Sequence, residues 1–253
     1  MNILDLDGKH SGETIFIIGS GPALNFLQPE DIHALSQKIT IGTNRVQYKV
    51  PVKYFVSSYP SEVLLASQTL HDSMLIHTRP TSEALLKGDF VTLKRVYSER
   101  VEDVPEHFDP ETPYLVTRNN VVFLMTNLAL IMGAKRLVYL GCEQRNGLHY
   151  YNQDDEALGL IVRDMCRVVS NHYDILGIDH PYEVPLNIMR GLLESPDVLR
   201  SRAFYAMNHF ELISQWVSRF SSSGVEFFSA VEDSIFVDAG ASFIDIKDAL
   251  NFQ

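Results

Sequence analysis

The feature that most constrains this chain is a repeated alternation of two hydrophobic patterns. Apolar or period-two runs of strand length recur, and longer stretches with the amphipathic spacing of a helix separate them. Parallel strands need such a helical crossover, because the chain must return to the start of the sheet before each new strand. We therefore predict an α/β fold with a mostly parallel, twisted sheet and helices on both faces.

The expected elements follow from these runs and from their end signals. Pro29 and Pro60 stand where first helical turns begin, and Gly133 and Gly224 follow helical runs where a left-handed cap is favoured. The order is typical of a Rossmann-like sheet. The expected strands are 14–19, 38–43, 52–58, 73–78, 90–97, 136–142 and 224–230, and the expected helices are 29–37, 60–70, 81–88, 119–134, 154–172 and 208–224.

Length and composition favour one domain. The chain has 253 residues, of which 45% are hydrophobic, which is enough for a sizeable core. We expect a single α/β domain over 1–253 that binds its ligand at the ends of the strands. Two irregular segments interrupt the alternation: an acid-rich and proline-rich loop at 98–114, and a segment at 177–207 that we expect to form a small helical lid or insertion.

Charge and apolar run length exclude two classes of partner. The formal net charge of −11 gives no general attraction to a phosphate backbone, so we expect no nucleic acid partner. The longest nearly apolar run, 121–134, is too short to span a bilayer, so we expect no transmembrane segment, although peripheral membrane association stays open. Two cysteines and the lack of a signal-peptide pattern favour the cytoplasm.

The first expected strand ends in a turn suited to a ligand. Gly19, Ser20 and Gly21 allow a tight turn and a close approach, and Pro22 suits the first turn of a helix. Exposed N–H groups there attract an anion, so a nucleotide phosphate or ribose is the expected occupant. Leu24 stands in place of the third glycine of a dinucleotide fingerprint, and no Walker sequence follows. The alternative is a plain connecting turn.

Polar residues follow other strands at the same edge of the sheet. Asn44 either offers a donor and an acceptor to a ribose or phosphate or caps a helix. The Ser58 hydroxyl either faces the same ligand cleft or caps the helix that begins at Pro60. Arg118, Asn119 and Asn120 precede the long apolar helix, where they suit an anionic carboxylate or phosphate, or serve as a cap.

The loop after strand 136–142 carries the densest group of polar and aromatic side chains in the chain. The residues of this loop that we take as candidates are Gly141, Glu143, Arg145, His149, Tyr150 and Tyr151.

The acidic residues elsewhere in the chain indicate no metal site. The segment 5–7 precedes the first expected strand, and 154–155 suits a helix N-terminus.

These motifs together resemble a known group of enzymes. The stretches IIGSGPAL, TNR, RNNVVFLMTNLALIMGAKRLVYLGCEQ and NGLHYYN are similar to those of the bacterial lipooligosaccharide sialyltransferases that use CMP-activated sialic acid. They are equally similar to the broader superfamily of unknown-function domains that includes motility-accessory flagellin glycosyltransferases and the archaeal-type 6-hydroxymethylpterin diphosphokinase. The resemblance covers roughly the first 150 residues.

The resemblance implies roles for particular residues. Ser20 and Asn44 match positions that contact the nucleotide, and 118–120 match a site for the carboxylate and phosphate of the donor. Glu143 replaces the aspartate that binds the nucleoside in the family motif, and Arg145 replaces the first tyrosine that contacts the leaving group. These two departures leave the base, and so CMP itself, open. The second such tyrosine matches Tyr150 or Tyr151.

The resemblance also implies the reaction. It is an inverting transfer of a sialic acid-like sugar to a glycan or protein acceptor in cell-surface glycan synthesis, with a histidine base. His209 matches the base position, and His149 is the alternative. No cofactor is required beyond the nucleotide-sugar donor, and a homo-oligomer is expected. Two alternatives remain: pyrophosphate transfer from ATP with Mg²⁺, as in the pterin diphosphokinase, and a nucleotide-binding module without catalysis.

Overall fold

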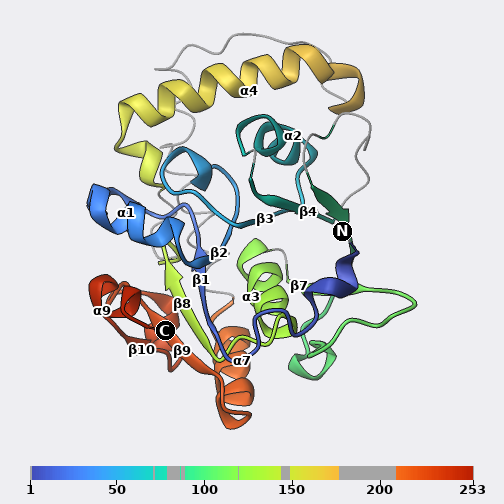
Figure 1. The fold of residues 1–253 in the computed structure, drawn as a ribbon, viewed down its shortest axis with the longest axis vertical. Helices are drawn as coiled ribbons and strands as arrows, with labels where there is room; N and C mark the ends of the chain where they lie inside the picture. Colours follow the sequence, from blue (N-terminus) through green and yellow to red (C-terminus); the bar gives the residue numbers. More distant parts are fainter. Residues whose placement is uncertain are drawn as a thin grey trace.

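The computed structural model confirms the predicted parallel α/β architecture (Figure 1). It describes residues 2–70, 72–78, 86, 89–118, 120–143, 149–176 and 209–252. Within these residues the main sheet has eight strands, all paired in parallel. Their order across the sheet is β10 (Ser242–Phe243), β9 (Glu226–Ser229), β8 (Arg136–Leu140), β1 (Thr14–Ile18), β2 (Ile39–Gly42), β3 (Tyr54–Ser57), β4 (Met74–His77) and β5 (Phe90–Thr92).

The central strand β1 shows why the apolar runs are continuous rather than alternating. All five of its residues are buried. Ile15 and Ile17 belong to the core on one face of the sheet, and Phe16 and Ile18 belong to the core on the other. A strand covered on both faces needs apolar side chains in both directions, so each face of β1 buries one half of the run.

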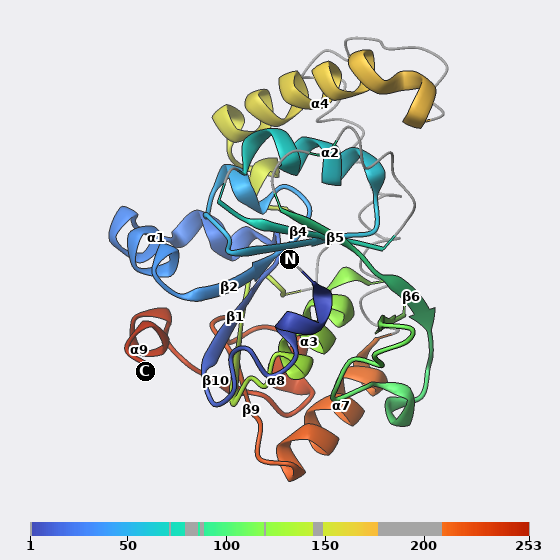
Figure 2. The same cartoon turned by 45° about the vertical axis from the view of Figure 1, so that its right-hand side comes forward.

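Two layers of helices cover the sheet, as Figure 2 shows for α2 and α4 on one side and for α3 and α7 on the other. The core that contains Ile15 and Ile17 also contains residues of α3 (Val121–Ile131), α7 (Phe210–Ser222) and α8 (Ile235–Asp238). The opposite core is completed by α1 (Pro29–Ser36), α2 (Pro60–Thr69), α4 (Asp155–Leu176) and α9 (Ile246–Leu250). We call these two sides the α3 face and the α4 face.

The expected strand at 90–97 is divided in the structure. β5 ends at Thr92, and β6 (Lys94–Tyr97) then pairs with β7 (Tyr114–Thr117) in a second, two-stranded sheet. The break is at Leu93, whose side chain is buried and whose N–H donates to the His77 carbonyl at 2.9 Å. The bend lets the chain leave the main sheet while its apolar residue stays in the core.

Strand β7 begins at the last residue of the segment 98–114, which we expected to be a loop, and it was not predicted. The side chain of Asn127 on α3 accepts from the Val116 N–H at 2.9 Å and donates to the Pro105 carbonyl at 3.0 Å. A buried asparagine therefore accepts a backbone N–H of β7 and also binds the preceding segment at Pro105. The sequence pattern does not reveal this because the bond depends on tertiary packing.

The structure also differs from the prediction in its helices and short elements at several places. The helix expected at 154–172 extends to Leu176, and the short elements β10, α8 and α9 were not predicted. The helix expected at 81–88, apart from Leu86, and the lid or insertion expected at 177–207 lie outside the described residues. Among the described helices, none combines the length and the apolar character needed to cross a membrane.

Candidate functional site

The candidate site lies where the sheet changes direction. From β1 the chain adds β2, β3, β4 and β5 on one side, and then β8, β9 and β10 on the other. The carboxyl ends of β1 and β8 therefore flank the topological switch point, which is where open α/β sheets bind their ligands. The two loops that leave these ends contain most of the residues that the sequence singled out.

The turns after β1 and β8 are in direct backbone contact. The N–H of Gly21 donates to the Gly141 carbonyl at 2.8 Å, and Gly141 has a φ of +64°. A Cβ at Gly19 would overlap the carbonyl oxygen of Gly141, and one at Gly141 would lie 2.5 Å from that of Gly19. The glycines are thus needed for the two turns to pack together, which is a more specific role than a flexible approach to a ligand.

The carboxylate of Glu143 occupies the position expected for a ligand anion. Its Oε1 accepts from the N–H of Ala23 at 2.8 Å, in the first turn of the 3-10 helix η2 (Pro22–Phe26). A Cβ at Gly21 would overlap its Oε2. The N–H groups of Gly21 and Ala23 are therefore already bound within the protein, and Pro22 has none.

The environment of Glu143 is unusual for a carboxylate. Burial raises its pKa, against the hydrogen bonds from its own N–H and from that of Ala23, which lower it. Its Oε2 is buried and has no hydrogen-bond partner among the described residues. A buried acceptor without a donor is costly, so this atom suits a donor that a ligand brings.

Next to this turn, Ser20 is paired with His149. The Ser20 hydroxyl lies 2.8 Å from Nδ1 of His149, and the Ser20 carbonyl accepts from the N–H of Tyr150 at 2.8 Å. The imidazole stacks on the Tyr151 ring, with 4.9 Å between ring centroids and 23° between planes. The structure therefore brings Ser20 together with His149 and Tyr151, two predicted site residues that lie more than a hundred positions away in sequence.

Arg45 and Glu62 join this group although neither was predicted as a site residue; Arg45 was only part of the TNR stretch. Arg45 binds Glu62 through Nη2 at 2.8 Å and the Tyr151 hydroxyl through Nη1 at 3.2 Å, and its carbonyl accepts from the Tyr150 hydroxyl at 2.8 Å. Burial alone lowers the pKa of Arg45, but the charge of Glu62 and the bonds to both partners raise it overall. The available signal was an arginine at the carboxyl end of a strand, directly after Asn44.

Asn44 lies at the end of β2 in a left-handed conformation. Its φ is +56°, and it is the only non-glycine residue with a positive φ among the described residues. Its side chain is half-buried and makes no hydrogen bond within the described part of the chain. A strained backbone with an unused amide is consistent with a ligand contact. Ser58, in contrast, is buried, and its hydroxyl lies 2.9 Å from that of Thr78.

A second group lies at the start of α3 and α7. His209 precedes α7, is 4% exposed and packs edge-on against Phe123. Burial lowers its pKa, a hydrogen bond to the backbone of Arg118 raises it, and the charge of Arg118 lowers it again, with a lowered value as the result. Arg118 pairs with the exposed Glu99 at 3.0 Å, and Asn120 caps α3 by accepting from the Val122 N–H at 3.0 Å.

The two groups belong to opposite faces of the sheet. Tyr150 and Tyr151 pack in the core of the α4 face, and Phe123, against which His209 rests, packs in the core of the α3 face. The structure thus places His149 and His209 beside the cores of opposite faces of the sheet. Arg145 and Asn119 lie outside the described residues. Those residues contain no group of three His, Cys, Asp or Glu side chains that could hold a metal ion.

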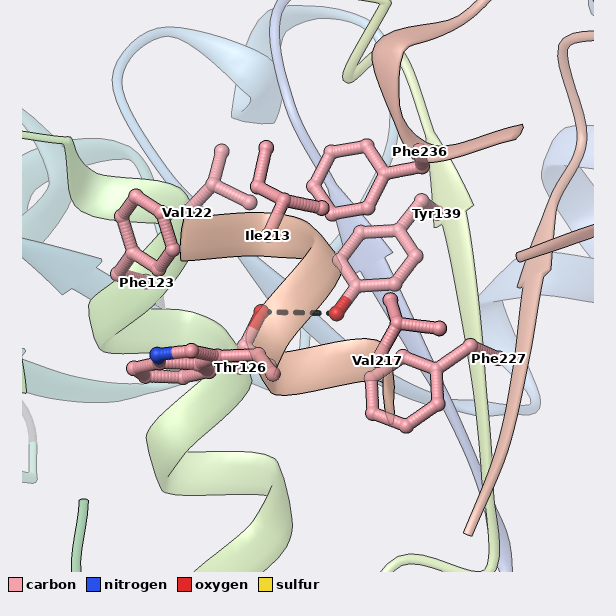
Figure 3. A pocket seen from close by; sticks show the side chains of 9 residues that line it. Val122, Phe123, Thr126, Tyr139, Ile213, Val217, Phe227 and Phe236 are labelled. Atoms are coloured by element: carbon pink, nitrogen blue, oxygen red, sulfur yellow. Dashed lines mark hydrogen bonds between the residues drawn. The ribbon is translucent and has the colours of Figure 1, made fainter. Parts of the chain in front are cut away.

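An apolar cavity lies below the first turns of α3 and α7 (Figure 3). Its only hydroxyl groups, those of Thr126 and Tyr139, bond to each other at 2.9 Å. The cavity holds about 10 Å³, which is room for a single water molecule. It is therefore a small apolar void within the α3 face.

Comparisons with family models, with curated proteins and with solved structures found no match.

The contact between the two turns can be tested with a matched pair of glycines. Gly141 and Gly8 have φ values of +64° and +65°, but a Cβ at Gly8 meets nothing within 4 Å. We expect Gly8→Ala to cost about 1 kcal/mol in left-handed strain and Gly141→Ala to cost about 1–3 kcal/mol more, because it also separates the turns. Urea unfolding of both variants measures the difference, and equal costs would contradict the close packing.

Proposed function

We propose that this protein is a glycosyltransferase that moves a sugar, of the sialic acid-like nonulosonate class, from a CMP-activated donor to a glycan or protein hydroxyl. The observation that carries the proposal is the gathering of the Ser20–His149 pair, Asn44 and Glu143 at the topological switch point. A base, an unused amide and an unpartnered carboxylate oxygen are the groups that a polyhydroxylated nucleotide donor needs. The cytoplasm is the proposed location, with which the free, buried Cys142 agrees.

The nucleoside is the part of the donor that fits the turn after β1. The N–H groups that would bind a phosphate there are occupied, whereas the buried Oε2 of Glu143 can accept from a ribose hydroxyl. Asn44 offers its amide on the neighbouring strand. The donor's anionic groups are assigned to Arg118, because its partner Glu99 is 68% exposed and such pairs exchange readily for a ligand anion.

The geometry favours His149 over His209 as the base. His149 is half-buried and is oriented by Ser20, whereas His209 is enclosed against Phe123. In the reaction the His149 imidazole takes the proton of the acceptor hydroxyl while the acceptor oxygen forms a bond to the anomeric carbon of the sugar. At the same time the bond between that carbon and the phosphate oxygen breaks, and CMP leaves with the bonding electrons. The Tyr150 and Tyr151 hydroxyls are bonded to Arg45, so their role is to hold the site.

One observation favours a second candidate function, that of a nucleotide-binding module without catalysis. Glu143 fills the anion position of the turn, so a nucleoside could bind at the switch point without its phosphates being activated. Pyrophosphate transfer from ATP with Mg²⁺ is a third outcome that the ligand experiment below separates. The leading proposal itself needs no cofactor.

The donor class is tested by calorimetric titration with CMP, CDP, UDP and ATP, the last with and without Mg²⁺. We expect the cytidine nucleotides to bind most tightly. Asn44→Gly should weaken binding about ten-fold while leaving stability unchanged or higher, because glycine adopts a positive φ freely, and Asn44→Ala should weaken binding and cost about 1 kcal/mol. Binding of ATP alone would overturn the donor assignment, and binding of none would overturn both nucleotide proposals.

The base is tested by the turnover of a CMP-nonulosonate. We expect His149→Ala to lower kcat by about 10²- to 10⁴-fold, the usual contribution of a general base, and His209→Ala to change kcat less than about three-fold. The reverse ranking would return the role to His209. A wild-type protein that binds the nucleotide but turns nothing over would instead support the binding module.

A further inference from the structure

We propose that Arg45 and Glu62 are positioning residues, which hold Tyr151 so that its ring fixes the His149 imidazole against Ser20. The inference rests on the proposed function for its kinetic consequences, but its structural core stands on contacts alone. The residues form one continuous series: the Glu62 carboxylate, the Arg45 guanidinium, the Tyr151 hydroxyl and ring, the His149 imidazole and the Ser20 hydroxyl.

Arg45 fastens the whole segment that carries the imidazole. It binds Tyr151 through its guanidinium and Tyr150 through its backbone carbonyl, so both aromatic residues of the 3-10 helix η6 (Tyr150–Asn152) are attached to this one residue. The guanidinium carbon also lies 5.6 Å from the centre of the Tyr151 ring. A planar cation with several donors can bind the Glu62 carboxylate and the Tyr151 hydroxyl at once, which a lysine does less well.

The ion pair is poorly optimised for stability alone. Glu62 is 7% exposed, and both Nε of Arg45 and Oε2 of Glu62 are buried without a hydrogen-bond partner among the described residues. A buried pair that leaves a donor and an acceptor unused gains little over apolar residues of similar volume. Its geometric effect on Tyr151 is therefore the better explanation for its presence.

The consequence for chemistry is orientation. His149 has one ring nitrogen bound by Ser20 and one face covered by Tyr151, so a shift of the Tyr151 ring would turn the imidazole away from that hydroxyl. A displacement of about 1 Å at a reacting group can cost about a hundred-fold in rate. Arg45 and Glu62 touch neither substrate nor reacting atoms in this scheme, and they act through Tyr151.

The test compares Arg45→Lys, Glu62→Gln and Tyr151→Phe with the wild type. Arg136→Lys is the matched control, because Arg136 also pairs with a glutamate, Glu226 at 3.2 Å, but at the opposite end of the sheet. Two readouts are recorded: kcat and KM for donor turnover across pH, and the ring-nitrogen NMR shifts of His149 as pH changes. Tyr151→Phe keeps the ring and loses only the hydroxyl that Arg45 holds, so it serves if Arg45 variants fold poorly.

We expect each of the three site variants to lower kcat about ten- to a hundred-fold, with KM changed less than about three-fold. We also expect all three to shift the His149 ring-nitrogen resonances in the same direction. Arg136→Lys should change neither readout. Unaltered His149 resonances in folded Arg45→Lys and Tyr151→Phe proteins would overturn the inference. Because the NMR readout needs no donor, shifted resonances in a protein without turnover would support the positioning role while the proposed function fails.

Discussion

The contact between the turn after β1 and the carboxylate of Glu143 is the interaction on which the site depends. It joins the loops that leave the two strands at which the sheet changes direction, and it uses the Ala23 N–H, while the neighbouring Gly21 N–H is bound by the Gly141 carbonyl. The packing that allows it needs glycine at 19, 21 and 141, because a side chain at any of them meets the opposite turn. A buried carboxylate thus replaces a bound anion within the fold itself.

The candidate site residues are divided between the two faces of the sheet. The α4 face carries the network from Glu62 to Ser20, which orients an imidazole, and the α3 face carries Arg118 and His209 at the start of two helices. Glu143 follows β8 and has one carboxylate oxygen bound and one without a partner in the described chain.

Local sequence patterns predicted much of the fold, because a buried parallel strand leaves a continuous apolar run and its helix leaves a periodic one. They failed where a neighbour decides the structure, as at Leu93, which stays buried where the strand breaks, and at β7, which pairs with β6 and binds the Asn127 side chain. The candidate site follows the same rule. Ser20 and His149 were found as motif residues, whereas Arg45 and Glu62 act only through contacts between distant segments.

The most direct test of this account is an NMR pH titration of the Ala23 amide, with Glu143→Gln as the reference. Burial raises the pKa of Glu143, so the Ala23 amide resonance should titrate with a midpoint above the usual range for a glutamate. In Glu143→Gln that transition should be absent. An Ala23 amide that is insensitive to pH in the wild type, or that titrates equally in both proteins, would contradict the placement of this carboxylate in the turn.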